Sequence, residues 1–180
     1  MSQRNYAIFG LLGPIVAFLF IGISIALSSW FSWGNNALSD LGHSIISYVA
    51  PLFNFGLLLS GFFIIIYALT SFRKHAKYTS NFLMFSGLSL QLVATFNEVY
   101  RPLHFQVSVL FFLSLLFVSL SYIIEKGSVL AVITLFIGFI SWIIYGLKVF
   151  STGIAVPETV SSMATSVWIA WSALRIYLKK

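Results

Sequence analysis

The chain has 180 residues, of which 59% are hydrophobic and only 8% are charged. Soluble domains carry about a quarter charged residues, so this chain has too few charges to cover a water-facing surface, and a membrane domain is expected. The absence of cysteine excludes disulfides, thiolate metal ligands and thiol catalysis. The net charge of +6 sits in short loops between apolar stretches, which indicates membrane topology and anionic headgroups rather than nucleic acid.

Six apolar stretches follow one another along the chain, and each is long enough to cross an apolar core about 30 Å thick. They show no period-two alternation, which argues against a barrel, and helices satisfy their own backbone groups in lipid. The sequence therefore predicts an all-α, polytopic membrane protein, a single domain over residues 1–180 built as a six-transmembrane-helix bundle. The predicted helices lie near residues 5–33, 48–72, 78–97, 104–124, 128–150 and 159–178.

The first stretch is expected to be retained as a helix rather than cleaved as a signal peptide. It is longer than a typical signal-peptide core, and it passes Pro14 without a clear small-x-small cleavage site.

The cationic residues predict how this bundle is oriented. With the N-terminus placed in the cytoplasm, two of the ten Lys and Arg residues, Arg101 and Lys148, fall outside and eight fall inside. This bias predicts a multi-pass protein of the cell membrane with both termini cytoplasmic. The eight inner cations are Arg4, Arg73, Lys74, Lys77, Lys126, Arg175, Lys179 and Lys180.

The acids and histidines gather in the segments predicted to lie outside: NNALSDLGHS (35–44), FNEVYRPLH (96–104) and KVFSTGIAVPET (148–159). Three of the four acids and two of the three histidines lie there. The positive-inside rule barely constrains acids, so this grouping is additional information. The candidate site residues in these segments are Ser39, Asp40, His43, Glu98, Arg101, His104 and Glu158.

Two imidazoles and two or three carboxylates at one membrane face match a zinc or similar divalent metal site with an open position for water. The ligands in this interpretation are Asp40, His43, Glu98 and His104, and the bound water would hydrolyse an ester or amide. A haem between His43 and His104 is disfavoured, because membrane cytochromes usually hold their ligand histidines within helices and His43 lies in or beside a loop.

Two other interpretations of these side chains stay open. They form a salt-bridge and hydrogen-bond cluster that ties the loops together, in which Arg101 neutralises a carboxylate, or they line a pocket for a polar headgroup, sugar or ion. Asn54, about ten residues beyond the first outer segment, would line the same pocket from deeper in the bundle.

The preferred function is an outward-facing polar pocket that binds a lipid headgroup or a small polar ligand. A metal-dependent membrane hydrolase acting on lipid is one alternative, and an accessory subunit of a membrane complex is another. Membrane lipid is the expected partner, and nucleic acid is not.

Four motifs stand in a fixed order along the chain: NALSDLGHS, APLFNFGLLLSG, LVATFNEVYRPLHFQVS and GIAVPE. Together they resemble the family catalogued as domain of unknown function 998, over nearly the whole chain. The resemblance implies a small multi-helix membrane protein of archaeal or bacterial type, distantly similar to Frag1/DRAM-type proteins. The positions that match the polar positions of the family are Ser39, Asp40, Glu98, His104 and Glu158.

This sequence also departs from these relatives at two points. Asn97 stands where the family often has a proline beside the acid, and no histidine follows His104. The more loosely similar membrane lipid hydrolases have paired histidines near the last helix, so their metal chemistry does not carry over.

Overall fold

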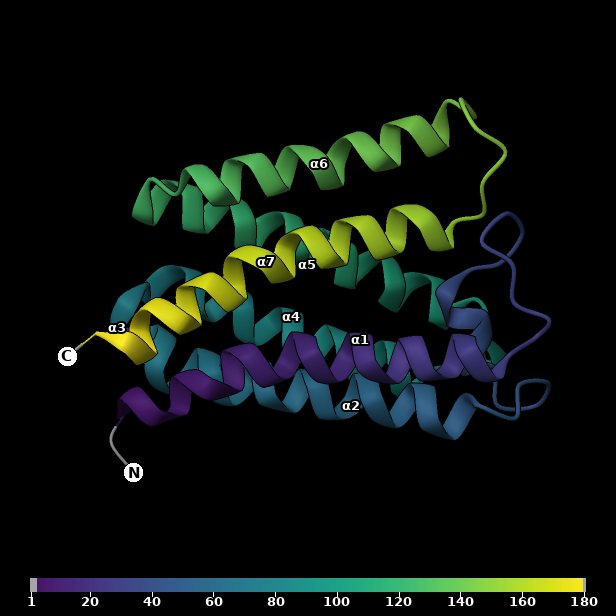
Figure 1. Ribbon diagram of the computed structural model, residues 1–180, viewed down its shortest axis with the longest axis horizontal. Helices are drawn as coiled ribbons and strands as arrows, with labels where there is room; N and C mark the ends of the chain where they lie inside the picture. Colours follow the sequence, from purple (N-terminus) through teal and green to yellow (C-terminus); the bar gives the residue numbers. More distant parts are fainter. Residues whose placement is uncertain (1–2, 180) are drawn as a thin grey trace.

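The computed structural model describes residues 3–179 as an all-α bundle, which confirms the predicted fold class (Figure 1). The first helix begins as a 3₁₀ segment, and the second ends in a π-helical turn. The backbone of each helix continues through this local change of pitch. The elements are η1 (Gln3–Ile8), α1 (Phe9–Leu27), η2 (Leu38–Gly42), α2 (Ala50–Tyr67), η3 (Ala68–Phe72), α3 (Arg73–His75), α4 (Lys77–Thr95), η4 (Glu98–Tyr100), α5 (Leu103–Lys126), α6 (Val129–Gly146) and α7 (Ala155–Leu178).

Two helix ends differ from the sequence prediction in ways that affect the site. The first helix ends at Leu27 instead of near residue 33, because the Ser28 amide turns back to the Ile25 carbonyl, 3.0 Å away, and a polar loop follows. The last helix begins at Ala155 instead of near residue 159. Pro157 is tolerated there because the first-turn amides have no intrahelical acceptor. Glu158 therefore lies on a helix and not in a loop.

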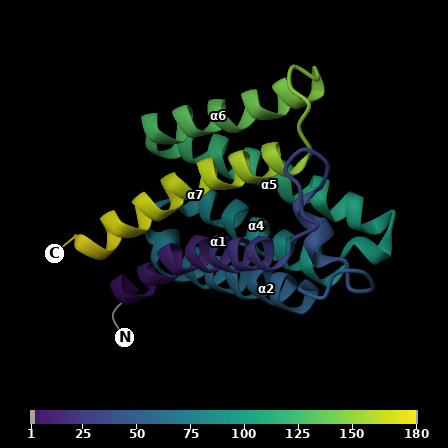
Figure 2. The same cartoon turned by 45° about the vertical axis from the view of Figure 1, so that its right-hand side comes forward.

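The helices form a closed ring in chain order. Neighbouring helices pack in the pairs α1–α2, α2–α4, α4–α5, α5–α6 and α6–α7, and α7 returns to pack against α1 (Figures 1 and 2). The N- and C-terminal ends lie at one end of the bundle, whereas η2 and the loops before α2 and α7 lie at the other (Figure 1). This arrangement brings the segments that carry the candidate site residues to a single end.

Within residues 3–179, four helices are long and apolar enough to cross a membrane: Arg4–Leu27, Ala50–His75, Leu103–Lys126 and Val129–Gly146. The other two long helices, α4 and α7, are richer in Ser and Thr, and many of these residues face the interior. Most of their hydroxyls donate to carbonyls of their own helix, as Thr165 Oγ1 does to Ser161 O at 3.0 Å. Such bonds satisfy hydroxyl groups that face other helices.

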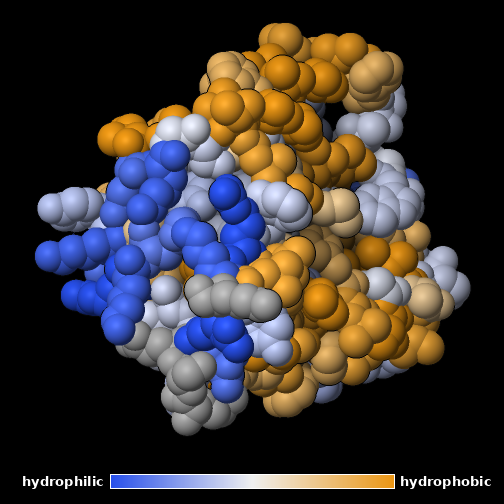
Figure 3. Space-filling model, turned by 60° about the vertical axis from the view of Figure 1, so that its left-hand side comes forward, coloured by the Kyte–Doolittle hydropathy of each residue, from blue (hydrophilic) through white to orange (hydrophobic). Residues whose placement is uncertain are grey.

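The end that carries the termini is strongly cationic. Figure 3 shows hydrophilic residues gathered at this end, while hydrophobic residues cover most of the remaining surface in view. Exposed cations lie at the helix ends here. Seven of the eight cations predicted to be cytoplasmic are among the described residues, and Lys180 is not. The seven are Arg4, Arg73, Lys74, Lys77, Lys126, Arg175 and Lys179.

Candidate functional site

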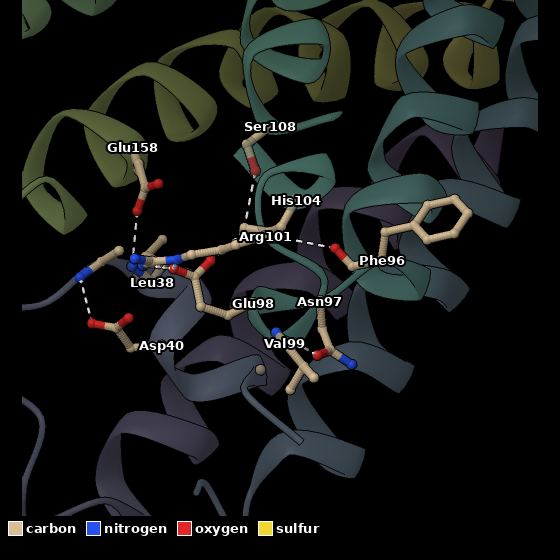
Figure 4. Close-up of polar contacts among 12 residues, drawn as sticks. Leu38, Asp40, Phe96, Asn97, Glu98, Val99, Arg101, His104, Ser108 and Glu158 are labelled. Atoms are coloured by element: carbon tan, nitrogen blue, oxygen red, sulfur yellow. Dashed lines mark hydrogen bonds and ion pairs between the residues drawn. The ribbon is translucent and has the colours of Figure 1, made fainter. Parts of the chain in front are cut away.

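Glu98 is the centre of a small polar cluster at the opposite end of the bundle (Figure 4). Asn97 caps the short η4 segment by accepting a hydrogen bond from the Val99 amide at 3.2 Å, which fixes the backbone at Glu98. Arg101 donates to Glu98 Oε1 from Nε at 2.7 Å and also from Nη2. His104 Nε2 lies 2.9 Å from the other oxygen, Oε2, so both carboxylate oxygens of this buried residue are engaged.

His104 is held in one orientation by its two ring nitrogens. Nδ1 lies 2.7 Å from the Phe96 carbonyl oxygen, which only accepts, so Nδ1 carries a hydrogen. Nε2 faces Glu98 and also lies 3.3 Å from Ser108 Oγ, one helical turn further along α5. The hydrogen bond between Nε2 and Glu98 therefore needs a proton on the imidazole or on the carboxyl group.

Glu158 ties the first turn of α7 to η2. Its Oε2 accepts a hydrogen bond from the Leu38 amide at 2.8 Å (Figure 4). The side chain is only 8% exposed, and within residues 3–179 no donor reaches its second oxygen, Oε1. A buried carboxylate with a single donor is energetically unfavourable unless another group pairs with it.

Asp40 stabilises the loop that contains it. Its Oδ2 accepts hydrogen bonds from the Ala37 amide at 3.0 Å and from Asn36 Nδ2 at 2.9 Å, which closes the start of η2. The N-cap of this segment is Ala37, and Asp40, at its third position, bonds back to the Ala37 amide. Half-buried His43 follows η2, and its Nδ1 has no hydrogen-bond partner among the described residues.

A groove about 740 Å³ in volume lies between α5, α6 and α7; we call it the α5–α7 groove. Its polar end is formed by Glu98, Arg101, His104 and Glu158. Its remaining walls are mostly apolar. These walls include Phe105, Val109, Leu113, Leu116, Phe139 and Trp142.

A second cavity, of about 120 Å³, lies among α1, α2, α4, α5 and α7; we call it the central cavity. Asn54 lines this cavity and donates from Nδ2 to the Gly42 carbonyl at 2.9 Å, so it also braces the loop after η2. The residues that line both the central cavity and the α5–α7 groove are Ser39, His104, Ser108, Phe112, Leu115, Glu158 and Thr165.

The structure brings together only part of the proposed metal-ligand set. Glu98 and His104 are in contact, but the Asp40 carboxylate is bonded to Asn36 and Ala37. His43 reaches Asp40 only through its backbone amide, which donates to the Asp40 carbonyl oxygen at 3.2 Å, and its imidazole Nδ1 has no partner among the described residues. Residues 3–179 contain no group of three or more His, Asp or Glu side chains that could hold a metal ion. Zinc sites use three or four protein ligands, so the metal site stays a prediction without geometric support.

Several contributors to the site were not predicted. Leu38 and Phe96 act through backbone groups, which leave no mark in a sequence. Ser108 stands four residues after His104 on one helix, a spacing that places both on the same face and was visible in advance. The wall residues on α5 repeat at helical spacing as well, but an apolar helix in lipid shows such residues on every side.

The fold defines the chain as a helical protein of membrane type, with a polar cluster at the end opposite its cationic surface. The model of the family described as protein of unknown function (DUF998) matches residues 11–175, so the chain belongs to this family. No curated protein and no solved structure matches the chain. The distant similarity to Frag1/DRAM-type proteins and the archaeal or bacterial type stay predictions.

Proposed function

We propose that this chain is a multi-pass protein of the cell membrane that binds one lipid molecule in the α5–α7 groove. The observation that carries the proposal is the polarity of the groove, which has ionisable side chains at one end and apolar walls along the rest. A lipid has the same division into headgroup and acyl chain. The volume of about 740 Å³ is within the range of about 300–1,000 Å³ that ligand pockets occupy.

The position of the groove favours a ligand that arrives from the bilayer. Phe105, Val109 and Leu113 on α5 and Phe139 on α6 line the groove and are also exposed on the surface of the bundle. These helices are among the four that are apolar enough to cross a membrane. A groove that opens between such helices is open toward lipid along its length.

The charge distribution supports an outward position for the polar end. The cationic surface with both termini lies at the far end of the bundle, and clustered Lys and Arg favour the cytoplasmic side. We therefore place the polar end of the groove at the outer boundary of the membrane, with both termini in the cytoplasm.

Lipid binding can be tested by blocking the groove with one large side chain. Val109 lines the groove and is 40% exposed, whereas Leu120, on the same helix, does not line it and is 38% exposed. Native mass spectrometry of protein purified in mild detergent should show one tightly bound phospholipid. Val109→Trp should weaken its retention roughly tenfold, and Leu120→Trp, the matched control, should leave it unchanged.

Equal retention by the two variants, or no retained phospholipid in the unaltered protein, would contradict lipid binding in this groove. Release of lipid fragments in a metal-supplemented assay, stopped by a chelator, would instead identify the chain as a metal-dependent hydrolase. Purification with a stoichiometric protein partner and no lipid would favour an accessory subunit.

A further inference from the structure

Glu158 gives the α5–α7 groove an unpaired hydrogen-bond acceptor, and from it we infer the headgroup that the groove selects. We propose that the groove prefers phospholipids with a primary ammonium headgroup, which donates a hydrogen bond to Glu158 Oε1. This inference rests on the proposed function, because it concerns the chemistry of a lipid bound in the same groove.

Glu158 differs from Glu98, the other acid that lines the groove. Glu98 already receives Arg101 on one oxygen and His104 on the other. Glu158 receives only the Leu38 amide, and no Lys, Arg or His side chain of residues 3–179 lies within ion-pairing distance of it. Glu158 is therefore the acid at this end that both lines the groove and has a carboxylate oxygen free to accept a hydrogen bond.

Burial makes this oxygen selective. Glu158 is 8% exposed, so its carboxylate is poorly hydrated. A ligand that brings a positive charge and a hydrogen-bond donor compensates for the lost hydration. An ammonium group supplies three N–H donors with its charge. A trimethylammonium group has the charge without the donors, and an anionic headgroup without an amine would meet a carboxylate.

Arg101 accounts for the phosphate of the same headgroup. Its side chain is 71% exposed at the polar end of the groove, and it engages Glu98 through Nε and Nη2, which leaves Nη1 available. Arginine suits phosphate oxygens because its planar donors match their geometry. Arg101 and Glu158 therefore present one cationic and one anionic group to a zwitterionic headgroup.

The experiment compares three phospholipids with identical acyl chains: phosphatidylethanolamine, phosphatidylcholine and phosphatidylglycerol. Native mass spectrometry of the purified full chain, with equal amounts of the three present, should show phosphatidylethanolamine bound about tenfold more than either of the others. This readout needs no altered protein, so it does not depend on how a variant folds.

Glu158→Gln should reduce that preference to about one, since the amide removes the negative charge at nearly constant shape. The matched control is Glu125→Gln, the same substitution at the far end of α5, where Glu125 accepts from Thr79 Oγ1 at 2.7 Å. It should leave the preference intact.

Two results would overturn this inference while leaving lipid binding in place. One is equal binding of the three phospholipids to the unaltered protein, and the other is a preference for phosphatidylethanolamine that persists in Glu158→Gln. Failure to retain any of the three phospholipids, or retention that Val109→Trp does not change, would instead contradict the proposed function itself.

Discussion

Glu98 connects two parts of the chain through its two carboxylate oxygens. One oxygen faces Arg101, in the loop between α4 and α5, and the other faces His104, on α5. The two partners differ in environment, because His104 is buried and Arg101 is largely exposed. Hydrogen bonds to a buried charged group contribute more than an exposed ion pair, since solvent screens the latter.

This difference predicts unequal effects of truncating the two ends of the cluster. Glu98→Ala should lower the free energy of unfolding by roughly 2 kcal/mol, because it leaves buried His104 without its acceptor. Arg101→Ala should lower it by at most about 1 kcal/mol. Denaturant titration in detergent micelles, followed by tryptophan fluorescence, measures both. An equal loss in the two variants would mean that the exposed arginine dominates the cluster.

At the same scale, the sequence was a better guide to which residues are candidates for the site than to which of them are in contact. Glu98 and His104 belong to the same predicted outer segment, FNEVYRPLH, so the sequence indicated that they lie near each other. The bond between Glu158 and the Leu38 amide joins segments 120 positions apart and involves a backbone donor, which no residue pattern identifies. The separate roles of Asp40 and Glu158 were also not predictable, because both are acids in polar outer segments.

At the scale of the helices, hydropathy predicted the fold class and the approximate position of every long helix. Its errors arise where residue type and conformation disagree. Trp30 and Trp33 continue the apolar pattern beyond Leu27, although the backbone has already turned there. Pro157 resembles a loop residue, yet it stands in the first turn of α7.

Close packing of α1 depends on glycine at one face and not at the other. A Cβ added to Gly10 would lie 2.7 Å from Ala173 Cβ on α7 and 2.8 Å from Tyr67 Cδ1 on α2, whereas one at Gly22 would meet nothing within 4 Å. Small residues at helix interfaces permit such close approach. The two glycines therefore form a matched pair within a single helix.

Gly10→Ala should accordingly lower the free energy of unfolding by about 1–3 kcal/mol, because the added methyl group forces α1 away from two neighbours. Gly22→Ala should be neutral or raise it by up to about 1 kcal/mol, since alanine favours the helix more than glycine does. The same fluorescence titration provides the measurement. Equal destabilisation by the two substitutions would show that α1 does not pack as described.

For the whole molecule, the two ends of the bundle should lie on opposite sides of the membrane. Because the chain has no native cysteine, single cysteines report accessibility without background. A membrane-impermeant maleimide applied to intact cells should label Ser151→Cys, in the loop before α7, and should label Lys74→Cys only after permeabilisation. Labelling in the reverse pattern would invert the orientation, and labelling of both in intact cells would contradict a fixed topology.

In the proposed function, the α5–α7 groove is a lipid site with its headgroup end at Glu98, Arg101, His104 and Glu158. The most direct measurement is an electron cryomicroscopy structure of the protein in nanodiscs that contain phosphatidylethanolamine. We expect elongated density along the apolar walls, with the headgroup beside Glu158. A groove that is empty or closed by side chains, while lipids are resolved elsewhere on the surface, would contradict the account.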